Sequence, residues 1–396
     1  MRFSATSSAV CVTIIISLAL GISCHAQAKP KLPKEKQLDR DVQFTRDPAN
    51  GEVRVVPTHS KAAEAPAHAE ENAPHAIRSE VSLVQAGCSA VAEDGSFVRG
   101  LTQSDFTLRA DSAPQAISNF DASTEPVHIV LLLDASPSEY HALENMKESA
   151  RALSAQLSPQ DEVAVVAFAG HSHLLLPFST DRTLLEEALT KVGLMRNIDE
   201  IGSNIYGSVF LAADELLSGP HAPSGRKAII LLSDGQDTGL KLSWDPASMF
   251  PPPGGANFLT FEDVVRELAA TGAQVFAIST ENRPKAMTAE WLKTHRGTTL
   301  IANDSRRLEI PAYTIYLAEL VRRAGGGLYF LREIGALSDV YARIAAELRT
   351  EYVLGFYPDG SFANAGWHQL QIALSEQQAR AVELNCRPAY YIPAPR

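Results

Sequence analysis

Residues 128–140 read "HIVLLLDASPSEY", an apolar run that ends in an aspartate and is followed by two serines. A continuous apolar run of this length is typical of a strand buried on both faces of a sheet. The tetrapeptide "SPSE" that comes next fits a helix-capping box, with Ser136 as the N-cap and Glu139 three residues later. Capping gives no reason for Asp134 or Ser138, so these two residues are candidates for function.

The rest of the central region alternates between strand and helix patterns. Short apolar runs of strand length recur along the chain, and longer stretches between them carry apolar residues at helical spacing. The predicted strands cover residues 128–134, 162–168, 173–178, 227–234 and 273–280, and the predicted helices cover residues 143–157, 182–192, 206–217, 260–272, 312–327 and 337–348. This alternation predicts an α/β fold with a doubly wound, mainly parallel sheet over residues 126–349.

Patterns typical of antiparallel strands flank this α/β unit on both sides. Residues 79–125 and 350–396 contain short segments in which apolar and polar residues alternate, divided by turn residues. We expect the two segments to pair into one small β-sandwich-like module, into which the α/β unit is inserted. Cys88 and Cys386 each continue an inward-facing alternation. A Cys88–Cys386 disulfide is therefore predicted, with two buried thiols as the alternative.

The N-terminal part is typical of an exported protein. Residues 1–28 combine one early charge, an apolar stretch and a small-residue cleavage site, which predict a signal peptide. A faint lipoprotein box ends at Cys24, but Gly21 stands where the box usually has a large aliphatic residue, so lipidation is the lesser alternative. Residues 29–78 are rich in Lys, Pro, Ala, Glu and His and predict a disordered linker. We expect a periplasmic, cell-surface or extracellular protein with no transmembrane span in the mature chain.

Two carboxylates and three hydroxyls fall where predicted strands end or helices begin. Asp134 and Asp234 each close a buried strand, and ligands of open α/β sheets bind beyond the carboxyl ends of the strands. Ser136 and Ser138 follow the first aspartate, and Ser203 precedes a predicted helix. An all-oxygen set with two carboxylates suits a hard divalent cation, Mg²⁺ first, with Mn²⁺ or Ca²⁺ as alternatives.

The D-x-S-x-S pattern that begins at Asp134, followed by Ser203 and Asp234, resembles the metal-ion-dependent adhesion site of von Willebrand factor A-type (VWA) domains. The resemblance implies that the three serines contact the metal directly, that the two aspartates act largely through coordinated water, and that a ligand carboxylate takes an open position. The segments around the site resemble a secreted VWFA-related family first described in acidobacteria, over roughly residues 77–392.

Three positions depart from the family pattern. Ser203 stands where threonine is usual and lacks the methyl group that restrains the rotamer of a threonine. Pro137 replaces a common glycine. Glu139 adds an acid that could either cap the following helix or crowd the metal.

These features predict an exported, non-catalytic binding or adhesion-type protein whose metal site captures an acidic side chain of a protein ligand. The alternatives are a metal-dependent hydrolase and a structural envelope module with a vestigial metal site. A hydrolase needs a base close to the metal-bound water, and Glu139 is the one candidate within the motif. The formal net charge of −11 argues against nucleic acid as a partner.

Two further features could affect binding. Long connections at residues 235–259 and 281–310 each contain a tryptophan, and we expect them to select the partner, with the basic residues of the second favouring an acidic surface. The motif "HSH" at residues 171–173 could hold zinc, but no third ligand is evident, so it is predicted to be an ordinary β-turn flank.

Overall fold

A computed structural model describes the greater part of the chain. The described residues are 31–40, 42–46, 52–57, 83–122, 125–139, 152–192, 194, 202–218, 222–223, 225–238, 259–288, 310–331, 337–358, 364–376, 378–379 and 381–393. The predicted signal peptide, most of the predicted helix at residues 143–157 and most of the two long connections lie outside these ranges. Within these ranges, the helices are all too short or too polar to span a membrane.

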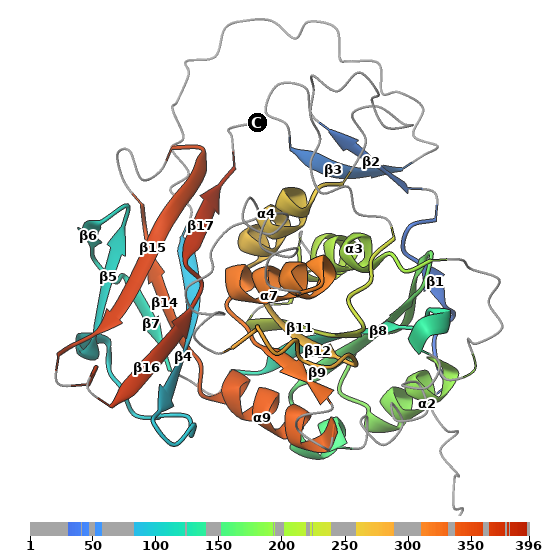
Figure 1. Cartoon of the computed structure of the whole chain (residues 1–396), viewed down its shortest axis with the longest axis horizontal. Coiled ribbons are helices and arrows are strands. Elements are labelled where there is room, and N and C mark those ends of the chain that lie inside the picture. The colour runs from blue at the N-terminus through green and yellow to red at the C-terminus, as the bar shows by residue number, and fades with distance from the viewer. Residues whose placement is uncertain are drawn as a thin grey trace, which may run out of the picture. The chain divides into compact units, whose positions relative to one another are not determined.

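A seven-stranded sheet lies at the centre of the described chain, in the order β1-β10-β9-β8-β11-β12-β13 (Figure 1). The strands from β9 to β13 in this order are parallel, and β10 and β1 are added antiparallel at one edge. Their bounds are β1 Lys36–Gln37, β8 Val127–Asp134, β9 Glu162–Phe168, β10 Ser172–Ser179, β11 Arg226–Ser233, β12 Gln274–Ser279 and β13 Leu328–Phe330. The prediction of an α/β fold with a mainly parallel sheet is confirmed.

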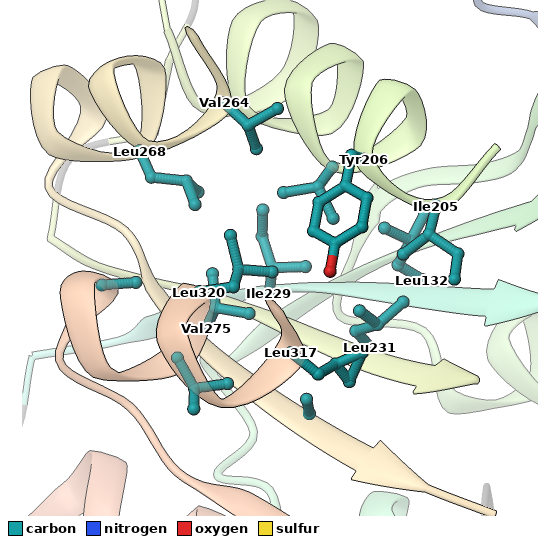
Figure 2. Packing of buried hydrophobic residues seen from close by; sticks show 14 of the residues in the cluster. Leu132, Ile205, Tyr206, Ile229, Leu231, Val264, Leu268, Val275, Leu317 and Leu320 are labelled. Atoms are coloured by element: carbon teal, nitrogen blue, oxygen red, sulfur yellow. The ribbon is translucent and has the colours of Figure 1, made fainter. Parts of the chain in front are cut away.

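Helices cover both faces of the sheet because its strands are apolar on both sides. Along β8, Val130 and Leu132 pack into one cluster with α3, α4 and α7, whereas Ile129 and Leu131 pack into a second cluster with α2 and α9. The bounds are α2 Arg182–Val192, α3 Ile205–Leu217, α4 Phe261–Thr271, α7 Ala312–Ala324 and α9 Leu337–Arg349. Figure 2 shows the first cluster beneath α3 and α4.

The flanking segments form a small two-sheet module, as predicted. One sheet has the order β16-β4-β14-β7 and the other β17-β15-β5-β6, and an apolar core lies between them. The bounds are β4 Val84–Ala92, β5 Phe106–Ala110, β6 Ala113–Gln115, β7 Asn119–Asp121, β14 Tyr352–Phe356, β15 Gly366–Leu374, β16 Val382–Cys386 and β17 Ala389–Ile392. Each sheet combines N-terminal and C-terminal strands, and Cys88 on β4 is bonded to Cys386 on β16.

Buried polar contacts join this module to the α/β unit. The Ser89 hydroxyl on β4 donates to the Glu347 carboxylate of α9 at 2.7 Å. The buried Arg226 guanidinium at the start of β11 donates to the carbonyl oxygens of Leu348 at 2.8 Å and Glu351 at 2.9 Å. Because these donors and acceptors are buried, their hydrogen bonds fix how the two parts meet.

The prediction of a disordered linker over residues 29–78 is wrong for three strands within it. β1 pairs with β10, and β2 (Val42–Arg46) pairs with β3 (Val53–Pro57) in a hairpin that lies beside α3 and α4 (Figure 1). The Phe44 ring packs edge-on against Phe210 of α3 at 5.5 Å, and Arg46 forms an ion pair with Asp263 of α4 at 2.6 Å. These strands form through tertiary contacts that local composition does not reveal.

Candidate functional site

Asp134, the last residue of β8, is the centre of the candidate site. It is fully buried, and its Oδ1 accepts a hydrogen bond from the backbone N–H of Ser136 at 3.0 Å. Its Oδ2 accepts from the hydroxyls of Ser233 at 2.7 Å and Ser203 at 3.0 Å. One carboxylate therefore ties the loop after β8 to the end of β11 and to the start of α3.

The two serines that follow Asp134 lie side by side. The Oγ atoms of Ser136 and Ser138 are 3.1 Å apart, and the backbone N–H of Ala135 donates to the carbonyl of Phe168 at the end of β9 at 2.7 Å. Ser136 is 3 % exposed, whereas Ser138 is exposed to solvent. Ser138 is therefore the hydroxyl of this loop that a molecule from solution can reach.

Ser203 is held by the loop that follows β11. The hydroxyl of Thr238 donates to the carbonyl of Ser203 at 3.0 Å and accepts from its backbone N–H at 3.0 Å. Asn204 caps α3, because its side chain accepts from the backbone N–H of Gly207 at 3.2 Å. Hydrogen bonds therefore join the N-terminus of α3 to the loop that follows β11.

Asp234 follows β11 directly and is 4 % exposed. Since β11 and β8 are adjacent parallel strands, with Leu232 opposite Leu133, Asp234 and Asp134 lie at the same edge of the sheet. Burial raises the pKa of Asp134, and the charge of Asp234 adds to this effect, whereas hydrogen bonds from Ser136 and Ser233 oppose it. The structure brings all five predicted residues to one edge of the sheet.

Glu139 does not form the predicted capping box. The backbone N–H of Ser136, which that box would direct to Glu139, donates to Asp134 instead. The Glu139 side chain is buried, and its Oε1 accepts from the Thr280 hydroxyl at 2.8 Å. Burial raises the pKa of Glu139 to about 7, with further contributions from the charges of Asp134 and Asp234. The capping explanation is therefore wrong, and a third carboxyl group lies close to the two aspartates.

The residues present fit a divalent cation. The donor set consists of carboxylate and hydroxyl oxygens, which are the ligands that Mg²⁺ and Ca²⁺ prefer. Two buried aspartates near each other are costly without a compensating positive charge. Among the described residues, no cluster of three His, Cys, Asp or Glu has metal-binding geometry, so the three hydroxyls are essential to this assignment.

Comparison with protein families supports the interpretation of this region. Residues 129–236 match the family model described as "von Willebrand factor type A domain". The chain carries a VWA domain. The matched segment contains all five predicted site residues, from Asp134 to Asp234. The chain has no match among curated proteins.

Several solved structures are similar to parts of the chain. BatB from Bacteroides thetaiotaomicron is 20% identical with a TM-score of 0.34, over 55% of this chain and 98% of that chain. A von Willebrand factor type A protein from Catenulispora acidiphila is 15% identical with a TM-score of 0.36, over 75% of each chain. The vWF domain of the type V pili tip protein Mfa5 from Porphyromonas gingivalis is 14% identical with a TM-score of 0.36, over 56% of this chain and 95% of that chain. At these low TM-scores, none of the likenesses supports a function for this chain.

Sequence reasoning missed the residues that support the site of the VWA domain. Ser233 and Thr238 hold Asp134 and Ser203, and Thr280 holds Glu139. A hydroxyl directly before a strand-ending aspartate, as in "LLSD", is a signal that could have identified Ser233.

The long connections around the VWA site are described only at their ends. Both predicted tryptophan-containing stretches lie outside the described residues. At the start of the second connection, the Arg283 guanidinium lies over the Phe330 ring, 5.5 Å from its centre. The prediction that these connections select a partner remains a prediction.

Proposed function

We propose that this protein is an exported, non-catalytic binding protein whose VWA domain holds Mg²⁺ and captures an acidic side chain of a protein ligand. The proposal rests on one observation, which is that five side chains with oxygen donors lie at the carboxyl edge of the sheet. Two of the donors are the buried carboxylates of Asp134 and Asp234, close enough that the charge of one raises the pKa of the other.

The proposed roles follow from the position of each side chain. Ser136, Ser138 and Ser203 would contact the metal, and Asp134 and Asp234 would hold it largely through water. Bound Mg²⁺ would supply an open coordination position for one carboxylate oxygen of the ligand. The exposed position of Ser138 supports access from solution on this side of the site.

Export is supported by the disulfide. Bonds such as Cys88–Cys386 persist in oxidising compartments outside the cytoplasm. The N-terminal sequence pattern and the resemblance to a secreted VWFA-related family agree with this location. We therefore infer a periplasmic, cell-surface or extracellular protein.

The hydrolase alternative has one observation in its favour, which is the position of Glu139 beside the aspartates. A general base must reach the proton that it removes. The Glu139 side chain is 4 % exposed and accepts a hydrogen bond from Thr280, so its present contacts favour a supporting role. A vestigial site in a structural module is the other alternative, and metal binding would exclude it.

A ligand-binding experiment tests the proposal. We expect a fluorescent glutamate-containing peptide to show higher anisotropy with the mature protein in Mg²⁺ than in EDTA. Ser138→Ala should remove the difference, because it deletes the exposed hydroxyl of the site. Ser104→Ala, at an exposed serine of the two-sheet module, is the matched control and should keep it. Equal anisotropy in Mg²⁺ and EDTA for the wild-type protein would contradict capture of an acidic group by the metal.

A further inference from the structure

Residues 32–40, 42–46 and 52–57 form an N-terminal strap, and its first strand, β1, binds along one edge of the central sheet. β1 pairs antiparallel with β10, with Lys36 opposite Leu174, and the backbone N–H of Leu38 donates to the carbonyl of Ser172 at 2.7 Å. Leu38 is 1 % exposed and packs into the same apolar cluster as α3. The strap lies outside residues 129–236, the segment that matches the VWA model.

Two carboxylate–imidazole contacts hold the strap to β10 and the turn before it. The Glu35 carboxylate lies 2.8 Å from Nδ1 of His173, and the Asp39 carboxylate lies 2.7 Å from Nδ1 of His171. We call these four residues the clasp. The clasp accounts for the "HSH" motif, because both histidines face acidic residues of the strap.

The turn that the clasp holds is also bonded to the candidate metal site. The carbonyl of Ala169 accepts from the backbone N–H of Asn204 at 2.8 Å, directly after Ser203. The Ser172 and Ser208 hydroxyls are 2.7 Å apart, and the Ser208 hydroxyl donates to the carbonyl of Asn204 at 2.6 Å. The strap and the N-terminus of α3 therefore both contact the same turn, residues 169–172.

We propose that the strap is a positioning element of the metal site. By fixing residues 169–172, it fixes Asn204 and with it the Ser203 hydroxyl that reaches Asp134. This inference rests on the proposed function, because it assigns a support to the same site. Groups that orient the ligands of a metal affect its affinity although they do not touch it. β1 is only two residues long, so this part of the strap depends on its contacts with β10 and the preceding turn to stay in place.

The clasp can be weakened without removing the rest of the strap. Glu35→Gln combined with Asp39→Asn keeps the size of both side chains and removes their charges. The hairpin retains its own anchors, which include the contact between Phe44 and Phe210. Lys34→Ala is the matched control, because Lys34 is an exposed charged residue of the strap next to Glu35.

Hydrogen exchange and calorimetry together test the proposal. In the double variant, we expect faster amide exchange in residues 35–40 and in residues 202–208, while β11 keeps the protection of the wild type. We also expect Mg²⁺ affinity to fall by about 10-fold, at the low end of the effect of supporting groups on metal sites. Lys34→Ala should match the wild type in both measurements.

The exchange measurement needs no metal, so it separates this inference from the proposed function. Faster exchange in residues 35–40 with unchanged exchange in residues 202–208 would overturn the positioning role. Unchanged exchange in residues 35–40 would overturn the assignment of the clasp. If the wild-type protein binds no metal while exchange is coupled as expected, the proposed function fails and the link between strap and α3 stands.

Discussion

Replacing Tyr206 by phenylalanine should stabilise this protein. Tyr206 lies in the first turn of α3 and is 2 % exposed, and its hydroxyl oxygen has no hydrogen-bond partner among the described residues. Figure 2 shows the side chain directed into the apolar cluster beneath α3. Burial raises the pKa of Tyr206 far above its usual range, which reflects the apolar surroundings of the hydroxyl.

The size of the effect follows from the cost of burying an unpaired polar group. Leaving a buried hydroxyl without a partner costs about 1–3 kcal/mol, and phenylalanine removes that cost. The ring remains available for its edge-on contact with Phe261, at 5.6 Å between centroids. Allowing for some loss of packing around the deleted atom, Tyr206→Phe should raise the free energy of unfolding by about 1 kcal/mol.

Urea unfolding followed by far-UV circular dichroism, in EDTA to exclude metal effects, measures this change. Tyr352→Phe is the matched control, because the Tyr352 hydroxyl donates to the carbonyl of Val98 at 2.9 Å and accepts from the backbone N–H of Leu101 at 3.2 Å. The control should lose about 1–2 kcal/mol. A destabilised Tyr206→Phe, or equal changes in the two variants, would refute the reasoning.

Three further predictions concern stability. Replacing both Cys88 and Cys386 by serine should lower the free energy of unfolding by about 2–4 kcal/mol in urea titrations, since the bond joins residues 298 apart in sequence, and an unchanged midpoint would contradict this. Gly326→Ala should lower the melting temperature, because an added Cβ would lie 1.9 Å from the carbonyl oxygen of Val275, and the cost should be about 1–3 kcal/mol. Burial raises the pKa of Glu351 to about 7, whereas the ordinary pKa of this group is 4.5. Between these two pH values the folded chain binds a proton at Glu351 that the unfolded chain does not bind. Wild-type stability should therefore rise as pH falls from about 8 to about 5, and Glu351→Gln should show a weaker rise; identical pH profiles would count against the assignment.

Local patterns predicted much of the VWA fold. The helix at residues 182–192 has the predicted bounds. Thr260, where the next predicted helix begins, caps α4, with its hydroxyl accepting from the backbone N–H of Asp263 at 3.2 Å. Both features depend on residues close in sequence, whose propensities act without tertiary help. The position of Asp134 and Asp234 at one edge followed from a second general rule, that parallel strands end on the same side.

Two features, β1 and the contacts of Glu139, depend on tertiary contacts and could not be predicted from local sequence patterns. β1 is only two residues long and exists because the edge of β10 is available to it. Glu139 satisfied the spacing of a capping box, but Asp134 takes the N–H that the box requires, so Glu139 turns to Thr280 instead. The partners that β1 and Glu139 find, β10 and Thr280, are both distant in sequence.

Calorimetric titration of Mg²⁺ into the mature protein tests the central claim most directly. The wild type should bind one ion, and Asp134→Ala should bind none, because the substitution removes the carboxylate that connects Ser203 and Ser233. Ser203→Thr should bind at least as tightly as the wild type, since it keeps the hydroxyl and adds the restraining methyl group. Circular dichroism should confirm that all three proteins are folded. Equal Mg²⁺ affinity in the wild type and a folded Asp134→Ala variant would contradict the proposed metal site.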